Sequence, residues 1–244
     1  MALIDVKSFK KSFRGKTVHK DISFSVNKGE CLGLVGGSGV GKSVVLRSLI
    51  GLEKADGGQI MIDGEDITKF SESQLTHVRI KVAYVFQNGA LFDSLTIFEN
   101  LAFPLREHTD LNENQIQEKI SEQLEEFGLS GNENLYPNQL SGGMQKRVGL
   151  ARSIIIGPKA ILYDEPTAGL DPYNTLKIQE MILRMKKKGV TSILVTHDMP
   201  TAFAVCDRFC LIEDGRIKAQ GTRDELENQK EGYLKKFIDG ERGK

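Results

Sequence analysis

The chain has 244 residues, enough for one large α/β domain or two small ones and for a sizeable buried core. Lys plus Arg and Asp plus Glu both number 33, so the formal net charge is zero, which argues against a nucleic acid as the main partner. No apolar run approaches the roughly 18 residues that a membrane-spanning helix needs, so we expect no such helix.

The first third of the chain reads as strands joined by turns around one helix. An apolar strand at Cys31–Val35 is followed by a turn and a helix over about 42–51. The stretch "GGQIMIDGEDI" is interrupted by Asp63-Gly64, which predicts a β-hairpin. The apolar "VAYVFQ" then predicts a further strand over 82–87.

From 88 to 157 the strand pattern disappears and apolar residues recur at helical spacing, as at Ile116 and Ile120. The later stretches "AILYDEP", "TSILVTHD" and "RFCLIEDGRI" each read as a strand followed by a turn or helix. We therefore predict a single α/β domain with the following parts, in residue numbers: a catalytic core with a β subdomain, 1–87 and 158–225; a helical subdomain, 88–157; and a C-terminal helical tail, 226–244.

A phosphate-binding loop is predicted between the first apolar strand and its helix, where "GGSGVGKS" fits the pattern G-x-x-x-x-G-K-[ST]. Glycines there let backbone N–H groups approach phosphate oxygens, and the helix N-terminus adds further donors. Lys42 can reach the β- and γ-phosphates, and the Ser43 hydroxyl can bind Mg²⁺. The expected nucleotide-binding residues of this loop are Gly36, Gly37, Ser38, Gly39, Val40, Gly41, Lys42 and Ser43.

An acid pair follows the strand "AILY". Asp164 lies at its carboxyl end, where ligands bind in open α/β sheets, and Glu165 comes next. A carboxylate at the first position can hold Mg²⁺, and one at the second can orient or deprotonate an attacking water. Acid pairs also occur in solvated turns, but beside a phosphate loop we interpret this pair as catalytic.

A second glycine pair opens the helix predicted in "LSGGMQKRVGLAR", residues 140–152. Ser141 can cap this helix, while Gly142 and Gly143 lie in its first turn. A helix N-terminus has unpaired N–H groups and a partial positive charge. The segment is therefore a second anion site of the same physical kind as the phosphate loop.

The motifs "GGSGVGKS", "LSGGMQKR", "ILYDEPTAGLD" and "LVTHD", in this order and spacing, resemble those of the ATP-binding subunit of an ABC transporter. The resemblance covers about 3–226 and implies a P-loop NTPase fold with a RecA-like core, an antiparallel β subdomain and a helical subdomain insert. It also implies ATP hydrolysis, with ATP and Mg²⁺ as cofactors, by a homodimer that forms in the ATP-bound state. Ser141, Gly142 and Gly143 would then bind the γ-phosphate of the ATP held by the partner subunit.

The resemblance also assigns roles to residues outside these loops. Phe13 matches the aromatic residue that stacks on adenine, although the family often has Tyr there, and Asp171 matches the loop that crosses to the partner subunit. Gln87 matches the glutamine that contacts Mg²⁺ and the attacking water, and His197 matches the histidine that bonds the γ-phosphate. The expected catalytic residues are Glu165, His197, Gln87 and Lys42, and the expected metal ligands are Ser43, Gln87 and Asp164.

The stretch after Gln87, "NGALFDSLTIFENLAFPLREH", bears on the partner. We expect its apolar side chains Leu91, Phe92 and Leu95 to be exposed and an integral membrane permease to dock near Asn88–Leu95. In wording it is similar to the ATPases of the Mla/Mce phospholipid systems. That likeness implies phospholipid transport between bacterial membranes, a place on the cytoplasmic side of the inner membrane, and Mce-type and accessory subunits as further partners.

Other functions remain as alternatives. ABC ATPases for amino acids or for lipoprotein release share these motifs. A soluble ABC ATPase acting on DNA or ribosomes would carry a long coiled-coil insertion or two ATPase halves, and this sequence has neither. A P-loop kinase would leave "LSGGM" and His197 unexplained.

The remaining cysteines and histidines are expected to be structural. Cys31, Cys206 and Cys210 lack the spacing of a zinc site, so we expect buried thiols kept reduced in the cytosol. The other histidines match no position of the family, and we expect them at the surface; they are His19, His77 and His108.

Overall fold

A ten-stranded mixed sheet organises the molecule in a computed structural model, which describes residues 1–228, Gly232 and Leu234. The order of the strands is β5-β4-β1-β2-β10-β9-β3-β8-β7-β6. Their bounds are β1 (Ala2–Phe13), β2 (Lys16–Asn27), β3 (Cys31–Gly36), β4 (Gly57–Ile62), β5 (Glu65–Asp66), β6 (Val82–Val85), β7 (Ala160–Asp164), β8 (Thr191–Val195), β9 (Arg208–Glu213) and β10 (Arg216–Thr222).

The strands that lead to the predicted site are parallel neighbours. β3 pairs with β8, β8 with β7 and β7 with β6, all in parallel register. Every residue of β3, β6 and β8 is buried, as expected for strands covered on both faces. The carboxyl ends of these strands therefore meet at one edge, which collects the loops that follow them.

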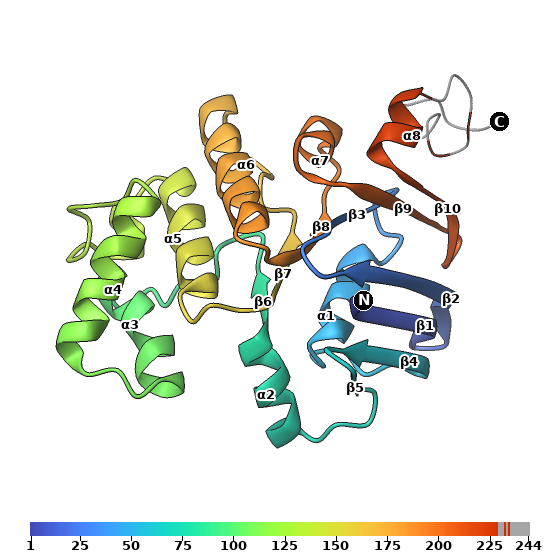
Figure 1. Ribbon diagram of the computed structural model, residues 1–244, viewed down its shortest axis with the longest axis horizontal. Helices are drawn as coiled ribbons and strands as arrows, with labels where there is room; N and C mark the ends of the chain where they lie inside the picture. Colours follow the sequence, from blue (N-terminus) through green and yellow to red (C-terminus); the bar gives the residue numbers. More distant parts are fainter. Residues whose placement is uncertain (229–231, 233, 235–244) are drawn as a thin grey trace.

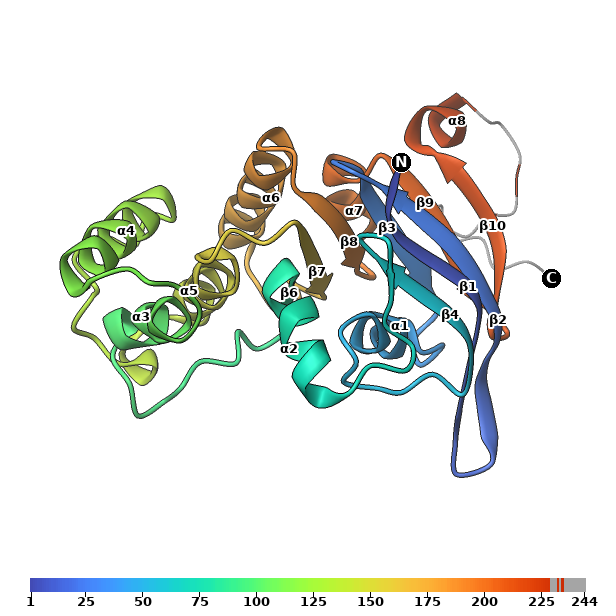
Figure 2. The ribbon, with the colours of Figure 1, turned by 60° about the horizontal axis from the view of Figure 1, so that its bottom comes forward.

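The other half of the sheet is antiparallel. β1 and β2 form a long hairpin, visible in Figure 2, and the sequence analysis did not predict these two strands individually. β4 and β5 form the hairpin that was predicted at the Asp63-Gly64 turn. A parallel pair between β10 and β2 joins the two halves. The α/β fold with an antiparallel part is confirmed.

Helices cover both faces of the sheet and extend to one side of it. They are α1 (Lys42–Leu49), α2 (Glu72–Lys81), α3 (Ile97–His108), α4 (Glu113–Glu126), α5 (Gly142–Ile154), α6 (Pro172–Lys187), α7 (Met199–Val205) and α8 (Arg223–Asn228), with a 3₁₀ turn η1 (Pro137–Gln139). Val45, Leu46 and Leu49 of α1 pack with one core cluster, on the face shared with the antiparallel strands. Residues of α3 to α7 pack with a second cluster on the other face.

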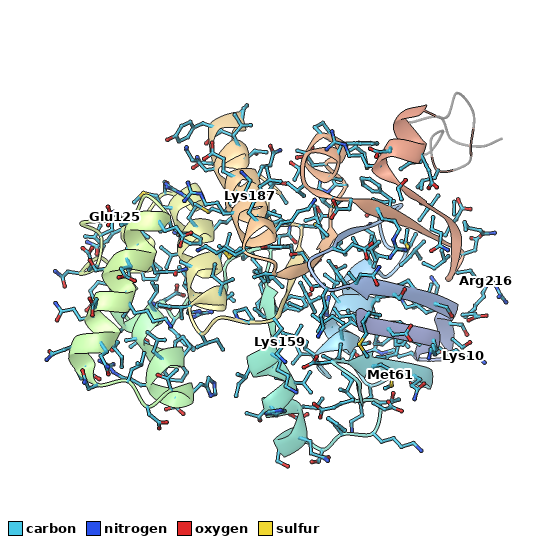
Figure 3. The ribbon with its side chains drawn as sticks, viewed as in Figure 1. Lys10, Met61, Glu125, Lys159, Lys187 and Arg216 are labelled. Atoms are coloured by element: carbon cyan, nitrogen blue, oxygen red, sulfur yellow. The ribbon has the colours of Figure 1, made fainter. Side chains whose placement is uncertain are left out.

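The segment 88–157 holds helices and turns, and α3, α4 and α5 gather at the left of Figure 1, away from the antiparallel strands. In Figure 3 the labelled Glu125 lies on this side, whereas Lys10 and Arg216 lie at the opposite end. Side chains of 88–157 hold the segment together from within. Asn100, fully buried, donates to the carbonyl oxygens of Phe92 and Leu95. The division of the chain into subdomains stays a prediction.

Most of the C-terminal tail predicted as a helix over 226–244 lies outside the described residues. α8 ends at Asn228, and Leu226 and Leu234 are buried against the second core cluster. Within the described part of the chain, no helix is long and apolar enough to cross a membrane. Cys31, Cys206 and Cys210 are buried free thiols, as predicted.

A contact between two glycines sets the loop after β6 directly on α5. Gly149 lies in the interior of α5, and a Cβ added there would lie 2.5 Å from the Cα of Gly89. The backbones at Gly89 and Gly149 therefore lie closer together than they could if residue 149 carried a side chain. Arg152, on the next turn of α5, donates to the carbonyl of Ala90. The position of this loop thus depends on the missing side chain at Gly149.

We predict that Gly149→Ala destabilises the protein by about 1–3 kcal/mol, although alanine normally favours a helix interior over glycine by about 1 kcal/mol. The added methyl group would force the 86–90 loop away from α5. Gly142→Ala, at the start of the same helix, is the control because an added Cβ there meets no atom within 4 Å. Denaturant unfolding measures both changes, and a Gly149→Ala protein as stable as wild type or more so would contradict the prediction.

Candidate functional site

The phosphate loop links β3 to α1 and is held by its own lysine. Lys42 is 8% exposed, and its Nζ donates to the carbonyl oxygens of Gly36 at 2.9 Å and Gly37 at 3.0 Å. Burial lowers the pKa of Lys42, while the carboxylates of Glu165 and Asp164 oppose this shift. The ammonium group therefore donates hydrogen bonds to the loop carbonyls in this structure, and it can bind an anion in their place.

The loop closes at Gly41, where only glycine fits. Its φ of 92° lies in the left-handed region, and an added Cβ would lie 2.6 Å from Nε2 of His19. That imidazole nitrogen lies 3.1 Å from the Gly41 carbonyl oxygen. His19 is fully buried and packs on Phe9, so the expectation that it lies at the surface was wrong. Its β2 strand passes beneath the loop, a contact that no local pattern reveals.

Asp164, at the end of β7, faces the start of α1. The Ser43 hydroxyl donates to its Oδ1 at 2.7 Å, and the Tyr84 hydroxyl donates to its Oδ2 at 2.6 Å. Parallel pairing of β6 with β7 brings Tyr84 to this carboxylate. Ser43 and Asp164, two of the three predicted metal ligands, are therefore in direct contact, and their role as ligands stays a prediction.

Glu165 lies one residue beyond the strand, in an unusual backbone conformation. Its φ is 50°, which costs a non-glycine residue about 1 kcal/mol or more, and its N–H donates to the carbonyl of Val195 at 2.9 Å. The carboxylate Oε2 accepts from the backbone N–H of His197 at 3.2 Å and lies 2.9 Å from the ring Nδ1. This geometry points Glu165 and His197 at each other across β7 and β8.

These elements meet at one cavity of about 620 Å³. It is lined by Ser38, Gly39, Gly41, Lys42, Ser43, Val44, Arg47, Glu165, Val195 and His197. Helix α1, which begins at the loop, lies within the curve of the sheet in Figure 2. A glycine-rich loop at a helix N-terminus, with a buried ammonium and the Glu165 carboxylate lining the same cavity, can bind a polyphosphate together with a cation; Asp164 does not itself line the cavity but contacts Ser43, which does.

A smaller hollow of about 380 Å³ adjoins the loop on the side of β2. Gly39 and Val40 form one wall, and Lys16, Thr17 and Val18 form another. Phe13 lies just before these residues in the chain, at the end of β1, and its ring is 38% exposed. The Lys11 ammonium lies 4.8 Å from the ring centroid on Phe13. Phe13 is thus exposed, as stacking on a base requires, but it does not line this hollow, and the stacking role stays a prediction.

The second glycine pair lies apart from this cavity. Ser141 caps α5, accepting from the N–H of Met144, and Ser141 and Gly142 are exposed. Gly143 packs so tightly on Asn174 of α6 that a Cβ there would lie 2.4 Å from the side chain. Asn174 in turn donates to Asp171, the exposed cap of α6. Asn174 therefore links Gly143 to Asp171, and none of these three residues lines the phosphate cavity of their own chain.

Gln87 is also exposed and does not line the cavity, although β6 delivers it to the same sheet edge as Asp164. Of the apolar residues predicted to be exposed nearby, Phe92 is 44% exposed, while Leu91 and Leu95 are half-buried. Leu91 packs against the core, so the expectation that it is exposed was wrong in part. His77 and His108 are exposed, as predicted.

Sequence reasoning missed two residues beside the predicted ligands. Arg47 lines the cavity one helical turn after Ser43, and the i, i+4 spacing along α1 was a signal that could have found it. Tyr84 contacts Asp164 only because β6 pairs with β7, and the sequence does not state that pairing.

The family model for the ABC transporter matches residues 19–168. This match covers the phosphate loop, the second glycine pair and the acid pair, and the chain belongs to that family. It is therefore an ATP-binding ABC ATPase, and its P-loop fold with a helical insert is the one predicted. The ATPase subunit of an ABC transporter is the class that the site and the fold define.

Individual relatives carry different transport names. The chain is 39% identical over 240 residues to the "probable ribonucleotide transport ATP-binding protein mkl" of Mycobacterium leprae, covering 98% of this chain and 69% of that protein. It is 36% identical to the "intermembrane phospholipid transport system ATP-binding protein MlaF" of Haemophilus influenzae, covering 98% and 91%. A solved dimeric ATP-binding cassette in a post-hydrolysis state, bound to ADP and Pi, matches with a TM-score of 0.84 and 30% identity over 90% of this chain and 98% of that one.

We predict that Glu165→Gln leaves ATP binding close to wild type but lowers the hydrolysis rate about 100-fold or more, because the amide cannot accept a proton. ATP binding and turnover are measured on the same preparation. Glu180→Gln, on the exposed face of α6, is the control for the same chemical change. Turnover that stays within a few-fold of wild type in Glu165→Gln would remove Glu165 from the catalytic role.

Proposed function

We propose that this protein hydrolyses ATP to power phospholipid transport between bacterial membranes, as the ATPase subunit of a complex with a membrane permease. The observation that carries the ATPase part is the convergence of Lys42, Glu165 and His197 on one cavity at the end of the parallel strands. Phospholipid as the cargo is supported by the amino-acid sequence of 88–108 and by the similarity to MlaF. Ribonucleotides, amino acids and lipoproteins are the alternative cargoes.

The oxygen atoms near the N-terminus of α1 suit a magnesium ion. Mg²⁺ prefers carboxylate and hydroxyl oxygens together with phosphate oxygens, and the Ser43 hydroxyl and the Asp164 carboxylate already lie 2.7 Å apart. These two residues would hold the ion, with Gln87 as a third ligand once its loop moves toward the site. When bound, the ion neutralises charge on the transferring phosphate.

The residues of the chain have separable tasks in hydrolysis. The Lys42 ammonium exchanges the carbonyl oxygens of Gly36 and Gly37 for phosphate oxygens, and the loop N–H groups bind the remaining ones. Glu165 orients the attacking water and accepts its proton on the carboxylate. His197, which contacts that carboxylate through Nδ1, would donate to the γ-phosphate through the ring nitrogen that carries its proton.

A second subunit completes each site. Ser141 and Gly142 are exposed at the N-terminus of α5 and face no phosphate in their own chain, so they suit the ATP of a partner subunit. Asp171 and Asn174 tie this helix end to the loop that precedes α6. The resulting homodimer would hold two ATP molecules, each between the phosphate loop of one subunit and the "LSGG" segment of the other.

The permease would dock on the segment that follows Gln87, near Asn88–Leu95. Phe92 and Phe103 form an exposed edge-to-face pair with ring centroids 5.4 Å apart, and Arg152 lies over the Phe92 ring. Exposed aromatic pairs of this kind suit the apolar face of a partner helix. The protein would thus lie on the cytoplasmic side of the inner membrane, with Mce-type subunits as further partners.

Purification of the complex from native membranes tests this function. A polytopic permease and bound phospholipid should copurify with the tagged chain, and ATPase activity of the complex should depend on Lys42. Isolation with a periplasmic amino-acid-binding protein and without phospholipid would favour the alternative cargo.

We predict that Phe92→Asp abolishes permease binding and transport, while the isolated subunit binds ATP as wild type does. An unpaired carboxylate buried in the interface should cost several kcal/mol, roughly 2–4. Leu52→Asp is the control, since Leu52 is 48% exposed and lies after α1, outside the segment 88–157. Copurification and nucleotide affinity are measured in parallel. A Phe92→Asp complex that assembles normally would place the permease elsewhere.

A further inference from the structure

The Asp164 carboxylate is held from both sides by hydroxyl groups. Ser43, on α1, donates to Oδ1 at 2.7 Å, and Tyr84, on β6, donates to Oδ2 at 2.6 Å. Both distances are short, as expected for hydroxyl donors to a charged acceptor. The carboxylate can therefore rotate only by breaking one of the two bonds.

The sheet places Tyr84 at this position by register. Tyr84 pairs with Leu162 of β7, two residues before Asp164, and both side chains lie on the face of the sheet that packs on α1. Asp164 follows at the same two-residue period, so it lies on that face as well. A tyrosine side chain is long enough to reach from Leu162 to the end of the strand.

Tyr84 has no direct access to the phosphate cavity. It is 8% exposed and is not among the residues that line the cavity; its hydroxyl bonds Asp164 and lies near Arg47, which lines the cavity. An ionised carboxylate can only accept hydrogen bonds, so the Tyr84 hydroxyl is the donor in its 2.6 Å bond to Oδ2. The ring also contacts Phe86, which precedes Gln87, at 4.4 Å between centroids.

We propose that Tyr84 is a positioning residue for metal binding: its hydroxyl fixes one oxygen of Asp164, so that the other oxygen faces Ser43 and the ion. The proposal rests on the assignment of Asp164 to Mg²⁺ under the proposed function. Partners that orient a metal ligand typically contribute about 10- to 100-fold to metal affinity. Because Tyr84 is attached to the strand that ends before Gln87, movement of that strand would reach the metal ligand directly.

Tyr84→Phe removes the hydroxyl and keeps the ring in the core. Tyr163→Phe is the matched control, since Tyr163 lies in the adjacent strand next to Asp164 but packs with the cluster on the opposite face. Both substitutions are made in a Glu165→Gln chain, which is expected to hydrolyse ATP too slowly to affect the binding measurements. The affinity of the ATP complex for Mn²⁺ is measured by electron paramagnetic resonance, and ATP affinity is measured without divalent metal.

We expect Tyr84→Phe to weaken Mn²⁺ binding about tenfold, with metal-free ATP affinity unchanged, and Tyr163→Phe to behave as the parent chain. Unchanged Mn²⁺ affinity in Tyr84→Phe would overturn the proposal. Equal losses of metal-free ATP binding and Mn²⁺ binding, or equal effects of the two Tyr→Phe changes, would also overturn it, because they indicate a general structural role.

Asp164→Asn separates failure of this inference from failure of the proposed function. If Asp164→Asn lowers Mn²⁺ affinity and Tyr84→Phe does not, the metal assignment stands and only the positioning role is lost. If Asp164→Asn leaves Mn²⁺ affinity unchanged, the assignment of Asp164 fails and the role of Tyr84 fails with it.

Discussion

The buried ammonium group of Lys42 is the constraint on which the site depends. A cation that is 8% exposed needs compensating oxygens, and the structure supplies the Gly36 and Gly37 carbonyls as contacts, with the Asp164 and Glu165 carboxylates nearby. Two strands supply these oxygens, since β3 carries the loop and β7 leads to the acid pair, while β8 leads to the histidine that contacts Glu165. Because these strands are parallel neighbours, their carboxyl ends bring the groups together without any long excursion of the chain.

Helix α5 joins the parts that a transport ATPase must coordinate. Its N-terminal end presents Ser141 and Gly142 to solvent, and its middle carries Gly149 against Gly89. One turn later, Arg152 contacts the Ala90 carbonyl and the Phe92 ring, where we propose that the permease docks. A displacement of that loop would therefore move the helix whose end is proposed to bind the partner's ATP. Because Gly149 has no side chain, the loop and α5 touch through their backbones. Movement of the loop is therefore transmitted directly to the helix.

What the sequence predicts well is local. The phosphate loop, the acid pair after an apolar strand and the cap at Ser141 each follow from short patterns with a direct physical reason, and the structure has each at the predicted place. The contacts that the sequence could not predict are those between segments far apart in the chain. His19 was expected at the surface and lies under Gly41, and Tyr84 bonds Asp164 across 80 positions, because strand order and register decide both. Gln87 follows β6 at the predicted edge of the sheet, but it does not line the cavity. The motif alone does not determine the position of the loop that carries it.

We propose that the phosphate loop of one chain works with the "LSGG" segment of the other. The most direct test is the ATPase rate of a linked pair in which one copy carries Lys42→Ala and the other Gly142→Asp. Each homodimer lacks an intact site, whereas the mixed pair retains one wild-type loop opposite one wild-type segment. We expect the mixed pair to recover part of the activity that both homodimers have lost. Wild-type activity in the Gly142→Asp homodimer would rule out a shared site, since Gly142 would then be only part of a helix cap.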